Sequence, residues 1–164
     1  MLNQLLAGGT MGSQIVVGGA TSLVNLMIHA LLLGVIVWTV RRLSVSDTSV
    51  PEFLQYTLGI VATGTLLVAG HLLEVVLWAL TYAWAGVAPP DTDLIYFAFG
   101  NYTTLGYGDV LPVEQWHLLG PMTALNGIML IGWSTALIFE ILRRTGHGKA
   151  ETLKPAPSRR SGRA

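Results

Sequence analysis

Three long apolar runs, separated by shorter polar segments, dominate the pattern of the chain. They cover residues 15–40, 57–85 and 118–142. Each run exceeds the roughly 20 residues that an α-helix needs to cross a bilayer, so each predicts a membrane-spanning helix. A fourth apolar stretch, at residues 91–102, is too short to span.

This fourth stretch predicts a helix that enters the membrane without crossing it. Pro89 and Pro90 end the second span, and Asp91 or Thr92 is expected to cap the short helix. About 11 residues at about 1.5 Å each reach only about half way through the hydrocarbon layer. The expected fold is therefore an all-α membrane protein with three transmembrane helices and one re-entrant helix.

The chain must return to the same side through residues 103–109, which read TTLGYGD. Non-helical backbone at membrane depth is tolerated only where protein buries it or where it lines a water-filled cavity. Gly106 and Gly108 permit backbone angles that turn successive carbonyls the same way, with Leu105 and Tyr107 pointing backward as packing. Because one chain supplies a single strand of such a carbonyl ring, the expected assembly is a cyclic homotetramer.

Composition and charge agree with a membrane protein and suggest its orientation. Hydrophobic residues make up 52% of the chain and charged residues 11%, against about a quarter in soluble domains. All lysines and arginines lie at 41–42 or from 143 onward. The positive-inside rule then predicts an extracytoplasmic segment 1–14, a cytoplasmic loop 41–56 and a cytoplasmic tail 143–164.

The remaining charged residues and the absence of cysteine further limit the classes of protein and site that the sequence allows. The outward segment 86–117 carries four acidic residues and no basic one, which would gather cations at that face. The tail 143–164 is basic and poor in hydrophobic residues, so it is expected to be disordered, either solvated or in contact with anionic lipid. The absence of cysteine excludes disulfides and thiolate metal sites. This distribution of basic residues does not favour nucleic acid as a partner.

The segment TTLGYGD resembles the selectivity-filter signature of tetrameric pore-loop potassium channels. The resemblance covers about residues 57–142: outer helix 57–85, pore helix 91–102, filter 103–109 and inner helix 118–142. It implies that K⁺ is bound by the carbonyls of Thr104, Leu105, Gly106 and Tyr107, together with the Thr104 hydroxyl. Thr103, Gly108 and Asp109 would then support the filter and form its outer mouth.

Two residues depart from the family pattern. Leu105 stands where valine or isoleucine is more common, which leaves the carbonyl in place. Gly100 stands where some members place an acid that pairs with the aspartate after the filter, so Asp109 needs another partner. Four aromatic residues are candidates either to brace Tyr107 or to anchor the chain at the membrane interface: Tyr96, Phe97, Phe99 and Trp116.

The first span is an addition to a two-helix channel subunit. It lacks the repeated arginines of a voltage sensor, so voltage gating by this helix is not expected. Gly18, Ser22, Asn25 and His29 recur at helical spacing on one face. That face is predicted to meet protein and not lipid.

Ionisable residues inside the spans predict a buried polar cluster. His71 and Glu74 lie one helical turn apart near mid-membrane, and His29 and Asn126 lie at similar depth. Three interpretations are open: a satisfied hydrogen-bond network, a proton-sensitive gate and a metal site.

The third span offers two candidate hinge glycines, Gly127 and Gly132, which are equally consistent with close helix packing. Met129, Gly132 and Ala136 share a face suited to line a cavity. Ser134 and Thr135 are expected to bond back to their own helix.

These features together predict a potassium-selective channel that conducts K⁺ passively, with no enzymatic activity and no cofactor or metal other than the permeant K⁺. Its expected partners are its own copies and the lipid bilayer, with the bacterial inner membrane as the expected location. One alternative is a poorly selective cation channel or the membrane subunit of a cation uptake system. Another is a membrane metal or redox protein that uses His29, His71 and Glu74.

Overall fold

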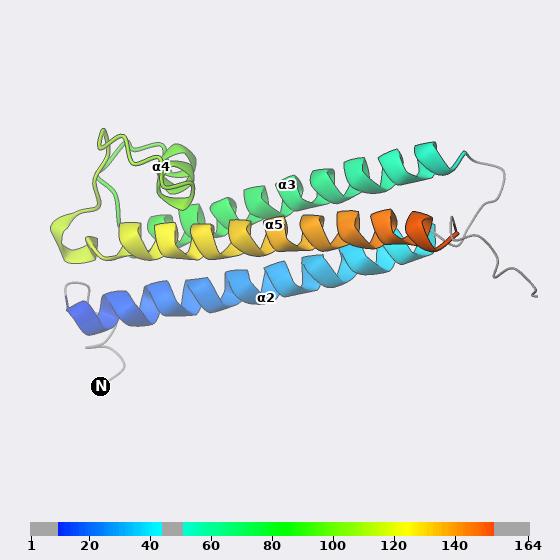
Figure 1. The fold of residues 1–164 in the computed structure, drawn as a ribbon. Coiled ribbons are helices and arrows are strands. Elements are labelled where there is room, and N and C mark those ends of the chain that lie inside the picture. The colour runs from blue at the N-terminus through cyan, green and yellow to red at the C-terminus, as the bar shows by residue number, and fades with distance from the viewer. Residues whose placement is uncertain (1–9, 44–50, 153–164) are drawn as a thin grey trace, which may run out of the picture.

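A computed structural model describes residues 10–43 and 51–152, and within these ranges it contains helices and no strands. Three long helices form an elongated bundle, and one short helix packs at one end of it (Figure 1). The elements are α2 (Met11–Leu43), α3 (Glu52–Ala85), α4 (Leu94–Tyr102), the 3₁₀ turn η1 (Glu114–Trp116) and α5 (Leu119–Thr152).

The long helices run alternately up and down the bundle. The helix α3 is antiparallel to both α2 and α5, and α4 lies at the end where α2 and α5 begin (Figure 1). Each long helix contains a segment long and apolar enough to cross a membrane: Met11–Val40, Phe53–Ala85 and, with η1 included, Glu114–Ile141. The three predicted spans are therefore confirmed as helices of membrane-spanning length and composition.

The helices extend past several of the predicted segment boundaries, because each continues beyond its apolar stretch. The helix α2 begins at Met11, inside the segment 1–14, and α3 begins at Glu52, inside the predicted loop 41–56. The helix α5 reaches Thr152, so the first part of the tail predicted to be disordered is helical. Hydrophobicity marks the depth of lipid, whereas helical hydrogen bonding continues into water. Residues 1–9, 44–50 and 153–164 lie outside the described ranges.

The start of α4 also differs from the prediction. Its N-cap is Asp93, not Asp91 or Thr92, and the Asp93 Oδ1 accepts hydrogen bonds from Ile95 N at 3.0 Å and Tyr96 N at 3.1 Å. Asp91 instead occupies the left-handed region with φ +63°. The helix is therefore shorter than predicted, with its end at Tyr102 as expected.

A core at one end of the bundle holds α4 against the long helices. Trp78 and Tyr82 of α3, Phe97 of α4 and Leu119 of α5 are buried there. The rings of Tyr82 and Phe97 lie 5.1 Å apart, and the Tyr82 hydroxyl bonds to Thr123 Oγ1 at 2.6 Å. This packing fixes the end of α4 from which residues 103–109 emerge.

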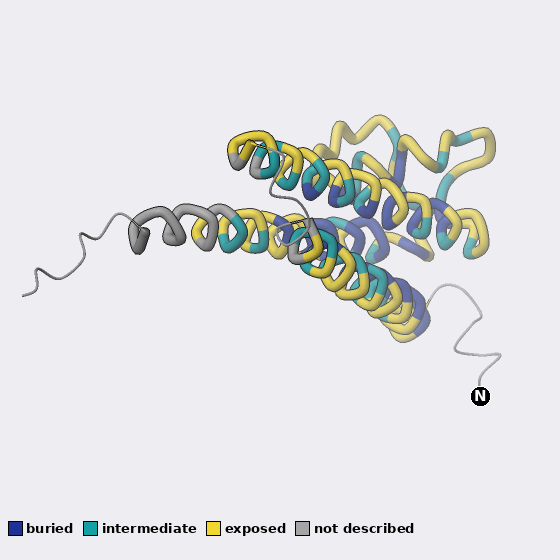
Figure 2. Tube along the Cα trace, turned by 90° about the vertical axis from the view of Figure 1, so that its right-hand side faces the viewer, coloured by how far each residue is buried: buried dark blue, intermediate teal, exposed yellow. Residues whose placement is uncertain are grey.

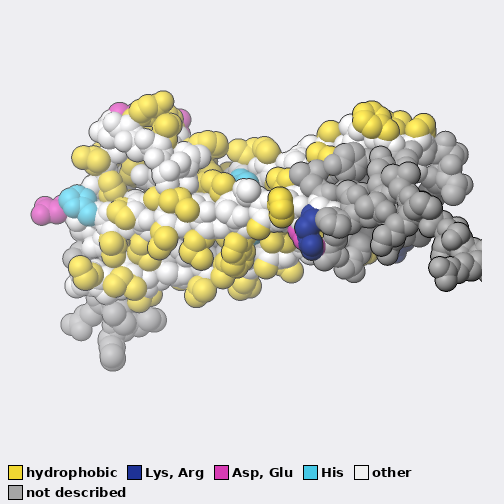
Figure 3. Space-filling view, in the orientation of Figure 1, with side chains coloured by type: hydrophobic (Ala, Val, Ile, Leu, Met, Phe, Trp, Pro, Cys, Tyr) yellow, Lys and Arg dark blue, Asp and Glu magenta, His cyan; other side chains and the backbone are white. Residues whose placement is uncertain are grey.

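The predicted protein-facing side of α2 is confirmed. Gly18, Asn25 and His29 are buried and Ser22 is half-buried. A Cβ at position 18 would collide with the Met122 side chain, so glycine permits close contact with α5. Elsewhere the long helices carry many exposed residues (Figure 2), and large apolar side chains are common among them (Figure 3). Such a surface is typical of a chain that meets lipid or further protein.

Candidate functional site

Residues 103–109 leave the C-terminal end of α4 and are all exposed on the single chain. Two glycines in this segment adopt the left-handed backbone region, Gly106 with φ +52° and Gly108 with φ +77°. A Cβ at Gly106 would come within 4 Å only of the Thr104 carbonyl oxygen, at 3.9 Å, and none of the described atoms would lie that close to one at Gly108. Glycine is therefore favoured here by the backbone angle and not by a lack of space.

The transition from α4 to this segment is a Schellman motif. Leu105 N donates to Gly100 O at 2.9 Å, and Thr104 N donates to Asn101 O at 3.0 Å. Thr104 occupies the left-handed position of this motif, with φ +60°. Glycine usually takes that position, so the sequence carried no signal for the motif. A left-handed threonine costs about 1–2 kcal/mol, which the two capping hydrogen bonds offset.

Asp109 has a partner that replaces the missing acid at position 100. The Tyr96 hydroxyl, from the first turn of α4, donates to Asp109 Oδ2 at 2.8 Å, while Asp109 Oδ1 accepts from Val110 N at 3.1 Å. The hydrogen bond to Asp109, together with its negative charge, raises the pKa of the Tyr96 hydroxyl above its usual 10.0. Tyr96 thus connects the two ends of the segment that includes α4 and residues 103–109.

The other aromatic candidates differ in how far they are buried within the single chain. Phe97 and Trp116 are buried in the core of the subunit, so they do not surround Tyr107. Phe99 is exposed, and Tyr107 itself is 72% exposed. Within one chain, Leu105 is likewise 54% exposed instead of packed behind the segment.

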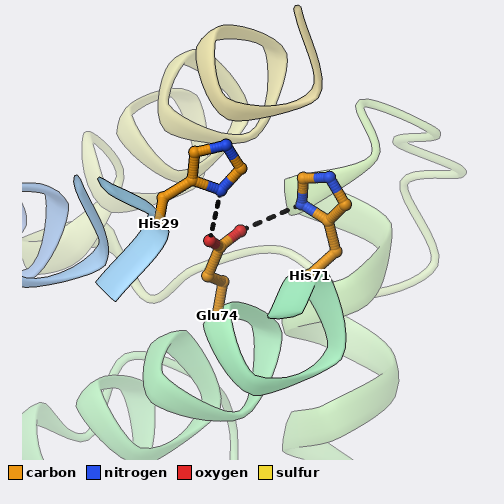
Figure 4. A group of neighbouring side chains, drawn as sticks. All are labelled: His29, His71 and Glu74. Carbon is orange, nitrogen blue, oxygen red and sulfur yellow. Dashed lines mark hydrogen bonds and ion pairs between the residues drawn. The ribbon is translucent and has the colours of Figure 1, made fainter. Parts of the chain in front are cut away.

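The predicted buried cluster forms between α2 and α3 (Figure 4). His29 Nδ1 lies 2.8 Å from Glu74 Oε1, and His71 Nδ1 lies 3.0 Å from Glu74 Oε2. His29 and Glu74 are fully buried, whereas the His71 side chain is 21% exposed. The structure therefore brings together three of the four residues that the sequence analysis placed at a similar depth in the membrane.

Two residues that the sequence analysis did not include extend this cluster. The Tyr102 hydroxyl donates to Glu74 Oε2 and lies 2.8 Å from His71 Nδ1. Ser134 Oγ of α5 lies 3.0 Å from His71 Nε2. The expectation that Ser134 bonds back to its own helix was wrong, while Thr135 does so, at 3.0 Å to Ile131 O. The cluster thus joins α2, α3, α4 and α5.

Asn126 belongs to a neighbouring network, which Asn25 links to the backbone of Glu74. Asn25 Nδ2 donates to Asn126 Oδ1 at 3.0 Å and lies 3.4 Å from the backbone oxygen of Glu74. Trp78 Nε1 donates to the same Asn126 oxygen at 3.0 Å. These bonds connect α2, α3 and α5 next to the cluster of His29, His71 and Glu74.

The two candidate hinge glycines occupy different surroundings within a continuous α5. A Cβ at Gly127 would collide with the carbonyl group of Tyr102, whereas among the described atoms nothing lies within 4 Å of a Cβ at Gly132. The geometry supports a packing role for Gly127. Met129, Gly132 and Ala136 are exposed on the single chain, as a cavity-lining face would be.

A comparison with protein families gives an independent indication of function. A family model described as "Ion channel" matches residues 70–144. The match begins within α3 and continues through α4 and residues 103–109 into α5, leaving α2 outside. No curated protein and no solved structure matches the chain. The family match supports an ion-channel function, and the three long apolar helices indicate an integral membrane protein.

Proposed function

We propose that the chain is the subunit of a homotetrameric, potassium-selective channel. In this proposal α3 and α5 are the outer and inner helices, α4 is a re-entrant pore helix, and residues 103–109 of four copies form the selectivity filter. The channel conducts K⁺ down its gradient and catalyses no reaction. The ion-channel family match over residues 70–144 covers all the filter residues and supports this assignment.

The observation that carries the proposal is the backbone of Gly106 and Gly108. Both residues have positive φ directly after α4 and alternate with Leu105 and Tyr107. Ion selectivity in K⁺ channels depends on rings of backbone carbonyls that replace the hydration shell. In the proposed ring, K⁺ is bound by the carbonyls of Thr104, Leu105, Gly106 and Tyr107, and by the Thr104 hydroxyl.

Exposed apolar side chains support assembly into a ring. Leu105 and Tyr107 are 54% and 72% exposed in one chain, and they alternate with the glycines of the filter segment. A fourfold arrangement would place the neighbouring subunit against them and close the carbonyl ring. Closed cyclic symmetry is the expected form of such an assembly.

The distribution of charge supports an orientation with both basic ends in the cytoplasm. Arg42 and Arg143 belong to the C-terminal parts of α2 and α5, which point away from α4 (Figure 1), while Asp91 and Asp93 directly precede α4 and Glu114 begins η1. The positive-inside rule then places α4 and the filter at the outer face. The proposed location is the bacterial inner membrane, with the N-terminus outside and the C-terminus inside.

Ion flux into liposomes tests this function. Purified protein is reconstituted, and K⁺ and Na⁺ fluxes are compared in the same preparation for the wild type, Gly106→Ala and Gly34→Ala. At position 106 alanine would require a left-handed angle, at a cost of about 1–2 kcal/mol per subunit. Gly34 is exposed on α2 with open space around a Cβ among the described atoms, which makes it a matched control.

The proposal predicts K⁺-favouring flux in the wild type and Gly34→Ala, and its loss in Gly106→Ala. Equal K⁺ and Na⁺ flux through the wild type would contradict potassium selectivity while leaving a cation channel. Unchanged selectivity in Gly106→Ala would contradict the assignment of the filter.

A further inference from the structure

We propose that His29, His71 and Glu74 form a binding site for a divalent transition-metal ion of the zinc class, within each subunit and separate from the filter. The three residues come from two helices, His29 from α2 and the other two from α3 (Figure 4). The site lies outside the proposed K⁺ pathway, so its existence does not depend on the proposed function.

The ligand atoms lie close enough to converge on one metal ion after a local rearrangement of the side chains. One nitrogen from each imidazole and one carboxylate oxygen all lie within 4.8 Å of one another. Metal–ligand bonds of about 2.0–2.1 Å in a tetrahedral site place neighbouring ligand atoms about 3.3 Å apart. The nitrogen–oxygen distances, 2.8 Å to Glu74 Oε1 and 3.0 Å to Glu74 Oε2, are a few tenths of an ångström shorter than this, while ligand atoms as far apart as 4.8 Å must approach by about 1.5 Å.

The charge of the cluster favours a cation. Glu74 is fully buried, and no lysine or arginine occurs in any of the three spans. With both imidazoles neutral, the carboxylate leaves one negative charge uncompensated at membrane depth, where unpaired charge is costly. A divalent ion supplies that missing charge and uses the neutral imidazoles as ligands.

The surroundings of each imidazole are compatible with coordination through Nδ1. Ser134 Oγ lies 3.0 Å from His71 Nε2 and can accept its proton when His71 Nδ1 binds a metal, which is the usual supporting arrangement. His29 Nε2 is buried with no hydrogen-bond partner among the described residues, so it is available to carry the ring proton when Nδ1, which contacts the Glu74 carboxylate at 2.8 Å, binds a metal instead. The Tyr102 hydroxyl oxygen, at 2.8 Å from His71 Nδ1, offers a fourth ligand atom.

The ligand chemistry selects the class of ion. Two imidazole nitrogens and one carboxylate oxygen form a set used by zinc enzymes, and imidazole also suits other late first-row metals. Calcium and magnesium prefer sites built from oxygen atoms alone. The half-buried edge of His71, with 21% of its side chain exposed, provides an entry path in the subunit.

Metal binding in this position would connect the additional helix to the base of the filter. The ion would join α2 to α3, and Glu74 already accepts a hydrogen bond from Tyr102, the last residue of α4. Residues 103–109 begin directly after Tyr102. We therefore expect bound metal to stabilise the docking of α2 and to raise the thermal stability of the subunit.

Calorimetric titration of the full chain with Zn²⁺ tests the site. The protein is purified in detergent and stripped with a chelator, and the wild type is compared with His29→Gln, His71→Gln and His117→Gln. Glutamine can keep a hydrogen bond to Glu74 but is a poor zinc ligand. His117 is exposed and lies outside the cluster, so it controls for zinc bound by surface histidines.

We expect one Zn²⁺ per subunit in the wild type and in His117→Gln. The affinity should fall by more than about a hundredfold in His29→Gln and in His71→Gln, beyond the 10–100-fold typical of a lost supporting residue. Zinc should raise the unfolding temperature of the wild type and of His117→Gln, but not that of His29→Gln or His71→Gln. The filter variant Gly106→Ala should bind zinc like the wild type, so the metal site and the proposed function fail separately.

Three results would overturn the proposal: no Zn²⁺ bound by the wild type, wild-type affinity in both cluster variants, or loss of binding in His117→Gln. Should the cluster variants fail to assemble, Co²⁺ in the wild type gives the answer. Intense visible absorption of a tetrahedral Co²⁺ complex supports the site, and the weak spectrum of hydrated or octahedral Co²⁺ contradicts it.

Discussion

Because α5 lies very close to the end of α4 at Gly127, adding one methyl group at this position is predicted to lower the stability of the subunit. A Cβ at Gly127 would collide with the Tyr102 carbonyl group, and that carbonyl belongs to backbone at the base of the proposed filter. Backbone at this point cannot rotate away like a side chain, because the capping bonds after Tyr102 hold it. Gly127→Ala must therefore displace α4 or α5.

The size of the effect follows from comparison with Gly132→Ala in the same helix. Both substitutions gain the same helix propensity, roughly 0.5–1 kcal/mol, so this contribution cancels between them. Overpacking a well-packed contact costs about 1–3 kcal/mol, and only position 127 has such a contact. With about 2–4 °C per kcal/mol for a chain of this size, Gly127→Ala should unfold about 2–12 °C below Gly132→Ala.

Thermal unfolding in detergent measures this difference. Both variants are scanned at one rate, since irreversible unfolding makes the midpoint depend on scan rate. K⁺ flux of Gly127→Ala, measured in liposomes, reports whether the displaced contact also disturbs the filter. An unfolding temperature for Gly127→Ala equal to or above that of Gly132→Ala would refute the packing role of Gly127 and leave the hinge interpretation.

Three further predictions concern polar contacts. Because Asp109 raises the pKa of the Tyr96 hydroxyl, the hydrogen bond between them should persist at pH 10 and be lost as the pH rises through that raised pKa. In an absorbance titration, Asp109→Asn should form tyrosinate at a lower pH than the wild type. Identical titrations of the two proteins would contradict the contact. Asp93→Ala removes the acceptor for two amides of α4 and should lower stability by about 1 kcal/mol, seen as a lower unfolding temperature. Asn126→Ala leaves the buried indole N–H of Trp78 without its acceptor and should cost about 1–3 kcal/mol, with an altered tryptophan emission spectrum; an unchanged unfolding temperature would count against the network.

The pattern of apolar positions predicted the existence of the elements better than their ends. Each apolar run corresponds to a helix, but α2, α3 and α5 all extend into polar sequence, because helical hydrogen bonds do not require lipid. The start of α4 was misplaced for a local reason. Asp91, Thr92 and Asp93 are all good capping residues, and only the left-handed turn at Asp91 selects Asp93.

Side-chain contacts were predictable where depth alone determines them. Antiparallel spans place His29 at the level of His71 and Glu74, and the structure confirms their contact. The participation of Tyr102 and Ser134 depends on how α4 and α5 rotate against α3, which the sequence pattern does not encode. The same limitation explains why Tyr96 was considered as a brace for Tyr107 when its hydroxyl in fact bonds to Asp109.

The reversal potential across a planar bilayer, with KCl on one side and an equal concentration of NaCl on the other, tests the central claim most directly. Each tenfold preference for K⁺ over Na⁺ shifts this potential by about 59 mV. A filter formed by residues 103–109 predicts a shift of at least that size in the wild type, and a shift close to zero or no current in Gly106→Ala. A wild-type potential near zero would contradict potassium selectivity through these residues.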